Sequence, residues 1–224
     1  LNITIPYKSE VMKYIDVIEK EALDLGAVNT IKVGSDNKLY GYNTDAYGFM
    51  RHLNLSAPMW KKKEGHITII GAGGASRAIM WSFLKENKTD IRLVNRSEER
   101  GLKLIKDMKK LFPLSKIHFS SNLSEALVNC SILVNCSSLG MSGQPKLKIN
   151  IENMNKDSIV YDIVYTPLVT ELLHEAKRLN YTAIDGLGML LNQAVPAFEM
   201  WHHRKVTVSE SLKKIALAHL EGAK

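Results

Sequence analysis

One strand–turn–helix segment constrains the fold of this chain more than any other feature. Residues 67–70 read as an apolar strand, residues 71–76 as a turn of small residues, and residues 75–86 as a helix. Because strands that alternate with helices form βαβ units, the chain is predicted to contain an α/β domain with a parallel sheet. Its other strands are expected at residues 91–94, 117–119, 132–134, 159–163 and 182–184, with a helix at 97–111.

The turn has the setting and the spacing of a dinucleotide-binding fingerprint. Gly71 would allow the tight turn, and Gly73 would let the backbone approach a pyrophosphate at the N-terminus of the following helix. The third small position is Ser76 rather than glycine or alanine, which is a mild departure. A glycine-rich turn that binds nothing is the structural alternative, but the strand–turn–helix setting favours the cofactor site. The predicted cofactor contacts here are Gly71, Ala72, Gly73, Gly74, Ala75 and Ser76.

The end of the next strand distinguishes between the two nicotinamide cofactors. NAD sites usually place Asp or Glu there, to bond the ribose 2′-hydroxyl. Here the strand runs into Asn-Arg-Ser at residues 95–97, with a second arginine one helical turn later, and arginine suits a 2′-phosphate. The glutamates at 98 and 99 are interpreted as first-turn residues of a capped helix that point away from Arg96. NADP(H) is therefore predicted, with contacts from Asn95, Arg96, Ser97 and Arg100.

Three short motifs precede this domain. Residues 2–8 read Asn-Ile-Thr-Ile-Pro-Tyr-Lys, residues 26–30 Gly-Ala-Val-Asn-Thr, and residues 41–45 Gly-Tyr-Asn-Thr-Asp. Each motif alone has an ordinary explanation, as a surface lysine, a turn asparagine or a helix-capping aspartate. The surrounding patterns predict strands at 2–5, 28–33 and 38–42, and helices at 11–25 and 46–53.

Taken together and in this order, the motifs resemble the shikimate dehydrogenase family. The resemblance implies NADPH-dependent, reversible reduction of 3-dehydroshikimate to shikimate in aromatic amino-acid biosynthesis. It covers essentially the whole chain, because matching motifs continue at residues 71–77, 95–97, 135–141, 161–167, 185–190, 193 and 198–201.

The resemblance implies roles for individual residues. Lys8 matches the catalytic lysine and Asp45 its partner, and an amine beside a carboxylate suits the proton transfer that accompanies hydride transfer. A polyhydroxylated acid needs fixed donors and acceptors if it is to be distinguished from its analogues. No metal ion is expected. The implied substrate contacts are Thr4, Asn29, Asp45, Tyr165 and Gln193, and the further cofactor contacts are Ile163 and Gly186.

The fold is expected to be two α/β domains with a cleft between them. A substrate domain is predicted over residues 1–58, a Rossmann-like NADP-binding domain over 64–186, and helices that return to the first domain over 187–224, at about 189–201 and 208–220. The family begins with a β-α-β segment carrying a Ser-x-Ser-Pro motif, and this chain has neither that motif nor an initiator methionine. The substrate domain is therefore expected to be incomplete, either by truncation or as a natural short paralogue.

Composition bounds the other functional classes. The net charge of +7 suits an anionic small molecule, and no nucleic acid is expected, because the basic residues are scattered apart from residues 61–63. No apolar run approaches about eighteen residues and the start does not resemble a signal peptide, so a cytoplasmic protein without a membrane partner is expected. Cys130 and Cys136 are expected to be reduced.

Two rival functions stay open at this point. One is an NAD-dependent quinate/shikimate dehydrogenase, which the arginines oppose. The other is a non-catalytic NADP-binding paralogue or fragment, which the missing amino-terminal segment leaves open. A monomer and a homodimer are equally compatible with the sequence.

Overall fold

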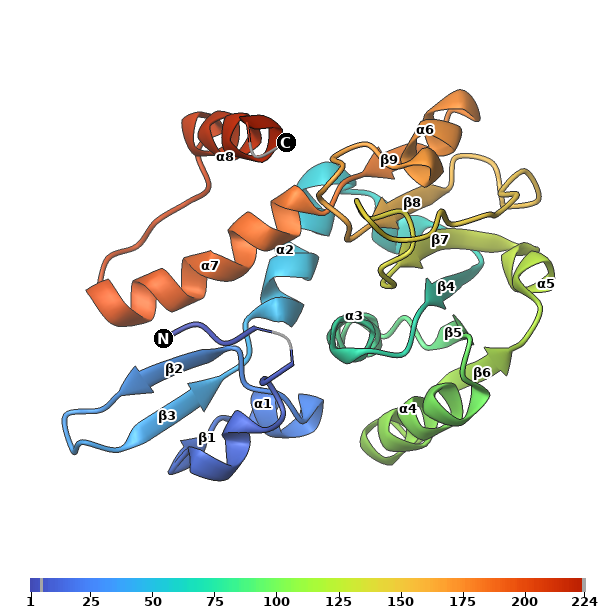
Figure 1. Cartoon of the computed structure of the whole chain (residues 1–224). Coiled ribbons are helices and arrows are strands. Elements are labelled where there is room, and N and C mark those ends of the chain that lie inside the picture. The colour runs from blue at the N-terminus through green and yellow to red at the C-terminus, as the bar shows by residue number, and fades with distance from the viewer. Residues whose placement is uncertain (5, 223–224) are drawn as a thin grey trace. The chain divides into compact units, whose positions relative to one another are not determined.

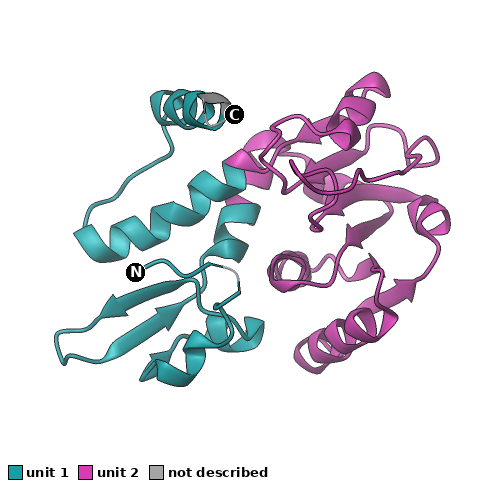
Figure 2. Cartoon of the chain, in the orientation of Figure 1, with its two compact units in different colours: residues 1–49, 188–224 teal, residues 50–187 magenta. Residues whose placement is uncertain are grey.

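The chain forms two compact units, described by a computed structural model that covers residues 1–4 and 6–222, without the side chains of 221 and 222. Unit 1 comprises residues 1–49 and 188–224, and unit 2 comprises residues 50–187 (Figure 2). The division falls within helix α2 (Asp45–Ser56) and just after the start of helix α7 (Leu187–His202). No helix in the described part of the chain is long and apolar enough to span a membrane.

Unit 2 contains a six-stranded parallel sheet in the order β6-β5-β4-β7-β8-β9 (Figure 1). The order reverses between β4 and β7, as in doubly wound dinucleotide-binding folds. The predicted α/β architecture is therefore confirmed. The strands are β4 (His66–Ile70), β5 (Asp90–Val94), β6 (Lys116–Ser120), β7 (Cys130–Asn135), β8 (Ile159–Asp162) and β9 (Thr182–Ile184).

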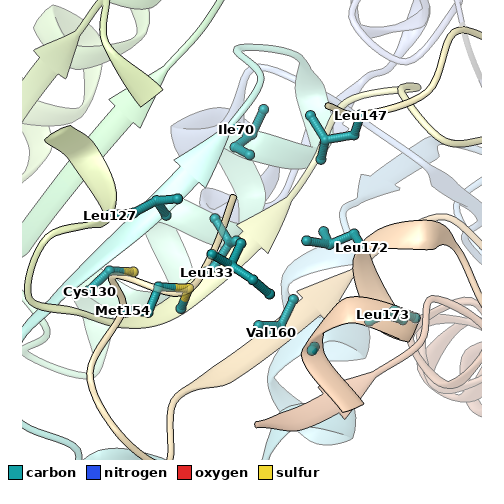
Figure 3. Packing of buried hydrophobic residues seen from close by; sticks show 11 residues of the cluster. Ile70, Leu127, Cys130, Leu133, Leu147, Met154, Val160, Leu172 and Leu173 are labelled. Atoms are coloured by element: carbon teal, nitrogen blue, oxygen red, sulfur yellow. The ribbon is translucent and has the colours of Figure 1, made fainter. Parts of the chain in front are cut away.

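Helices cover both faces of this sheet. The helices α3 (Gly74–Lys85) and α4 (Glu98–Leu111) cover one face, and α5 (Leu123–Leu127) and α6 (Glu171–Arg178) cover the other. Every residue of β4 and β7 is buried, as expected of central strands covered on both sides. Figure 3 shows the core on the second face, where strand and helix side chains pack together: Leu127, Leu133, Val160, Leu172 and Leu173.

The sequence did not predict α5 or α6. Each is short, and α5 has only five residues. Asn122 and Thr170 cap their N-termini by accepting hydrogen bonds from backbone N–H groups of the first turn. So few residues show little helical periodicity, so capping and burial decide these elements.

Unit 1 contains a three-stranded sheet in the order β1-β3-β2. Strand β1 (Val17–Ile18) lies parallel to β3 (Leu39–Tyr42), and β2 (Thr30–Val33) lies antiparallel to it. The expected strand at 2–5 is reduced to one bridge from Asn2 to Thr30, and Ile5 lies outside the described residues.

The predicted helix over residues 11–25 is wrong. The segment forms a 3₁₀ helix (Val11–Tyr14), strand β1 and helix α1 (Lys20–Leu25). Pairing with β3 interrupts the helix, because the backbone N–H of Asp16 donates to Leu39 and that of Glu19 donates to Gly41. The apolar side chains that suggested a helical period still face one cluster, which includes Ile15, Ile18 and Ala22.

The two C-terminal helices are confirmed to within two residues, as α7 and as α8 (Glu210–Gly222). Both cysteines are free thiols. Burial raises the pKa of Cys130 to about 11, so this residue is a protonated core side chain near neutral pH.

Acid should destabilise unit 2 through His66, whose ring is buried and whose Nε2 lies 2.8 Å from the carbonyl of Ala126. Burial lowers the pKa of His66 below its ordinary value of 6.5, so the unfolded chain binds a proton first as the pH falls through that value. We expect the free energy of unfolding, measured with urea, to depend less on pH in His66→Gln than in wild type between about pH 7.5 and 5.5. His118→Gln, at an exposed position of β6, is the control. Equal pH dependence in His66→Gln and wild type would contradict the assignment.

Candidate functional site

A lysine and an aspartate form the charged centre of a polar cluster in unit 1. The Nζ of Lys8 donates a hydrogen bond of 2.7 Å to Oδ2 of Asp45, and the two side chains are 25% and 11% exposed. Asp45 is the first residue of α2, where the helix dipole stabilises a negative charge. Its backbone N–H is bound by the side-chain oxygen of Asn43, which anchors the start of the helix. The pair therefore combines an ammonium donor with a carboxylate held in place.

Asn29 holds the second oxygen of this carboxylate. Its Nδ2 donates to Oδ1 of Asp45 at 2.9 Å and to Oγ1 of Thr44 at 3.0 Å. Its Oδ1 accepts from the backbone N–H of Thr44 at 2.9 Å. Asn29 is only 2% exposed, so its buried amide holds Thr44 and Asp45 in place through these hydrogen bonds. Thr44 was not among the residues predicted from the sequence, although it directly precedes Asp45 in the motif at 41–45.

Gln193 joins the cluster from α7. Its Oε1 lies 3.3 Å from both Nδ2 of Asn29 and Oγ1 of Thr44. The two helices cross closely at Gly48, where an added Cβ would lie 2.6 Å from Cβ of Gln193 and 2.7 Å from its backbone nitrogen. The absence of a side chain at Gly48 therefore lets α7 bring Gln193 to the start of α2.

Two of the predicted substrate contacts are not part of this cluster. Thr4 is exposed, and its carbonyl accepts a hydrogen bond from the backbone N–H of Tyr7. Tyr165 belongs to unit 2, in the loop after β8, where its side chain is 39% exposed. The structure thus brings together Lys8, Asn29, Asp45 and Gln193.

The glycine-rich turn of unit 2 leaves open space at the N-terminus of α3. Gly71 has a φ of +106°, and a Cβ there would lie 3.1 Å from the backbone of Cys136. A Cβ on Gly73 or Gly74 would meet nothing within 4 Å. The first N–H groups of a helix have no partner within the helix, so this end offers donors and a positive dipole to an anion. The turn fits a pyrophosphate.

The contacts of Ser76 explain why a serine can occupy the third small position of the fingerprint. The residue is fully buried, and its Oγ accepts a hydrogen bond of 3.3 Å from the backbone N–H of Gly73. A hydroxyl at the third small position therefore helps to hold the turn that precedes it.

Two arginines that follow β5 are free to bind an anion, Arg96 in the loop after the strand and Arg100 in the first turn of α4. Nδ2 of Asn95 donates to the carbonyl of Ser97, and Ser97 caps α4 by accepting from the N–H of Arg100. Arg96 and Arg100 are both exposed. Among the described side chains the arginine ion pairs involve Arg77 and Arg178, and neither Arg96 nor Arg100 takes part in one. This arrangement fits a phosphate group bound beyond the end of β5.

The remaining predicted cofactor contacts meet at the carboxyl ends of β8 and β9. A Cβ on Gly186 would lie 2.1 Å from the carbonyl oxygen of Ile163, so the two backbones touch. The N–H of Ile163 donates to the carbonyl of Asn135, the last residue of β7. Dinucleotides bind beyond the carboxyl ends of the strands in such sheets, where these residues lie.

A doubly wound unit with a phosphate-binding turn, combined with a unit that carries a paired lysine and carboxylate, defines a dinucleotide-dependent dehydrogenase. Two family models match the chain, "Shikimate dehydrogenase substrate binding domain" over residues 1–31 and "Shikimate / quinate 5-dehydrogenase" over residues 56–190. The chain belongs to the shikimate dehydrogenase family, as its motifs predicted.

Relatives and solved structures agree with this assignment. The shikimate dehydrogenase (NADP(+)) of Paramagnetospirillum magneticum is 42% identical over 217 residues, which cover 97% of this chain and 78% of that protein. Quinate dehydrogenase from Corynebacterium glutamicum in complex with NAD superposes with a TM-score of 0.88 at 27% identity, covering 96% of this chain and 77% of that one. Shikimate 5-dehydrogenase from Thermus thermophilus in complex with NADP(H) and shikimate gives a TM-score of 0.82 at 28% identity, covering 98% and 78%.

Two glycine substitutions should separate cofactor binding from folding. We expect Gly73→Ala to leave the thermal midpoint nearly unchanged, because its methyl group meets open space, and to weaken NADPH binding by about tenfold, because that space receives the pyrophosphate. Gly71→Ala should lower both stability and affinity, because its backbone has a positive φ and Cys136 lies against it. Fluorescence titration and thermal unfolding measure the two effects. Unchanged NADPH affinity in a folded Gly73→Ala protein would contradict this site.

Proposed function

We propose that this protein catalyses the reversible, NADPH-dependent reduction of 3-dehydroshikimate to shikimate. The observation that carries the proposal is the pair of Lys8 and Asp45, held by hydrogen bonds in a chain of this family. We further propose that it is a cytoplasmic enzyme of aromatic amino-acid biosynthesis and acts as a monomer or a homodimer.

NADP(H) would be held by unit 2. The turn at 71–76 would hold the pyrophosphate, the exposed arginines at 96 and 100 would hold the 2′-phosphate, and Ile163 and Gly186 would contact the nicotinamide half. Bound cofactor supplies or accepts the hydride at the substrate's ring carbon. The exposed guanidiniums, free of ion pairs, support a 2′-phosphate, which a carboxylate at this position would repel.

Lys8 acts as the general acid and base. Its ammonium group has three N–H donors and the contact with Asp45 uses one, which leaves others for the substrate oxygen. In reduction Lys8 donates a proton to the carbonyl oxygen, and in oxidation it takes the proton from the hydroxyl. Asp45 orients the amine, and Asn29 in turn fixes the Asp45 carboxylate.

The substrate's hydroxyls and carboxylate would be recognised by a set of fixed polar groups. Donors and acceptors that are already placed distinguish a polyhydroxylated acid from analogues lacking a hydroxyl. Asn29 and Gln193 already share a hydrogen-bond network with Thr44, which supports their assignment to one face of the substrate. The proposed substrate contacts are Thr4, Asn29, Asp45, Tyr165 and Gln193.

Quinate oxidation with NAD is the second candidate. The similarity to the quinate dehydrogenase of Corynebacterium glutamicum favours it, and the unpaired arginines at 96 and 100 oppose it. Steady-state assays with shikimate and quinate, each with NADP⁺ and NAD⁺, decide between the two functions. A higher kcat/KM for quinate with NAD⁺ would replace the proposal.

Cofactor choice should depend on Arg96 and Arg100. NADPH should bind at least about tenfold more tightly than NADH, since each charge-assisted contact to the 2′-phosphate adds affinity. We expect Arg96→Ala to remove most of this difference and to leave NADH affinity unchanged in calorimetric titrations. Lys106→Ala, which removes an exposed positive charge from the same helix, α4, is the control. Tighter binding of NADH by wild type would refute the assignment.

Loss of the Lys8 amine should stop proton transfer and leave the cofactor site intact. We expect Lys8→Ala to lower kcat by about a hundredfold or more with unchanged NADPH affinity, and Asp45→Asn to impair turnover as well. Lys13→Ala removes a lysine whose side chain is 70% exposed and serves as the control. Near-normal turnover in Lys8→Ala would show that another group moves the proton.

A further inference from the structure

Three buried polar side chains connect the loops at the carboxyl end of the unit 2 sheet. Asn135 is the last residue of β7 and Asp162 the last residue of β8, and the two are paired in register. Thr170 caps α6, eight residues after Asp162. Asn135 and Asp162 are 0% exposed and Thr170 is 2% exposed. Side chains so deeply buried are held by hydrogen bonds to one another and to the backbone.

Asp162 lies at the centre of these bonds. Its Oδ1 accepts from Nδ2 of Asn135 at 2.9 Å and from the N–H of Val164 at 3.0 Å, and its Oδ2 accepts from Oγ1 of Thr170 at 2.8 Å. Burial raises the pKa of Asp162 above its ordinary value, and these three hydrogen bonds oppose that shift by favouring the carboxylate. Two of the three donors belong to the loop after β8.

Asn135 extends the same bonds to the loop after β7. Its Oδ1 accepts from the N–H and the hydroxyl of Ser137, and its Nδ2 also donates to the carbonyl of Leu139. Its backbone carbonyl accepts from Ile163. The next residue, Cys136, donates its N–H to Ile70, which precedes the glycine-rich turn.

A cavity between these two loops leaves part of the space between them unfilled, so hydrogen bonds contribute to their spacing. The cavity has a volume of about 300 Å³, and its walls include Leu139, Met141, Pro167 and Val169. Close packing therefore fills only part of the space between the loops. Apart from the bonds of Asp162 and Asn135, a backbone hydrogen bond from Ser142 to Thr166 also joins them.

We infer that Asp162 is a positioning residue for the nicotinamide half of the cofactor. This inference rests on the proposed function. A doubly wound sheet consists of two mononucleotide-binding halves. The half made by β4, β5 and β6 carries the glycine-rich turn and the arginines, so the half made by β7, β8 and β9 is left for the nicotinamide. Asp162 fixes the two loops of that half, including Ile163 beside it.

The test compares two ligands that share the adenosine half. NADPH carries both halves, whereas adenosine 2′,5′-bisphosphate carries the 2′-phosphate and no nicotinamide. We expect Asp162→Asn to raise the Kd for NADPH by about tenfold and to change the Kd for the bisphosphate by less than about twofold in calorimetry. Asp90→Asn is the control. It makes the same substitution at the exposed first residue of β5, at the amino end of the strand, and should change neither Kd.

A second variant covers the case in which Asp162→Asn does not fold. Thr170→Val removes one of the three donors to Asp162 and should raise the Kd for NADPH by about threefold, with the Kd for the bisphosphate unchanged. Thr170→Ser keeps the hydroxyl and should keep the wild-type affinity. Unchanged NADPH affinity, or equal weakening of both ligands, in the folded variants overturns the inference. If wild type binds neither ligand, the proposed function fails first, and the positioning role fails with it.

Discussion

Ile70, Asn135 and Asp162 lie at one level across three adjacent parallel strands, and this register determines what unit 2 can bind. Ile70 pairs with Asn135, and Asn135 pairs with Asp162, so the three chains leave the sheet side by side. Because the strands are parallel, the loops that follow them all begin at the carboxyl end of the sheet. A shift of register would separate the glycine-rich turn from the loops after β7 and β8. The dinucleotide site therefore depends first on backbone pairing and only then on its side chains.

In unit 1 the main constraint is electrostatic, because the charged pair of Lys8 and Asp45 is mostly buried. Asn29, Thr44 and Asp45 are 2%, 3% and 8% exposed. Burial of a polar group is costly unless it is hydrogen-bonded. Here the Asp45 carboxylate has Lys8 on one oxygen, Asn29 on the other and the positive end of a helix dipole behind it. The same bonds that make burial tolerable also fix the direction in which Lys8 presents its remaining donors.

The features that were predictable from the sequence are those that are local in the chain. The strand before Gly71 and the turn after it are contiguous, and the buried parallel strands form short apolar runs between turn residues. The capping role of Ser97 was predictable for the same reason. The prediction for residues 11–25 failed because a single helix and a strand followed by a helix can both direct the same apolar side chains toward one core.

Contacts between distant residues could not be predicted in this way. Lys8 and Asp45 are 37 positions apart, and only a family resemblance placed them together. Asn135 and Asp162 are separated by 27 positions, and nothing local distinguishes a network carboxylate from any aspartate at a strand end. Thr44 was missed because its partners, Asn29 and Gln193, come from other elements. Their meaning depends on strand register and helix crossing, which composition and periodicity do not contain.

The bare backbone at Gly48 has a consequence for how this protein tolerates change. Glycine inside a helix costs about 1 kcal/mol relative to alanine, so helix α2 gives up stability at this position. Replacing such a glycine is an ordinary route to a more heat-resistant protein. In this chain even a methyl group would press on the backbone of Gln193 and move the amide away from Asn29 and Thr44. At this position a gain in helix stability would therefore be set against the loss of the contacts that Gln193 makes with Asn29 and Thr44.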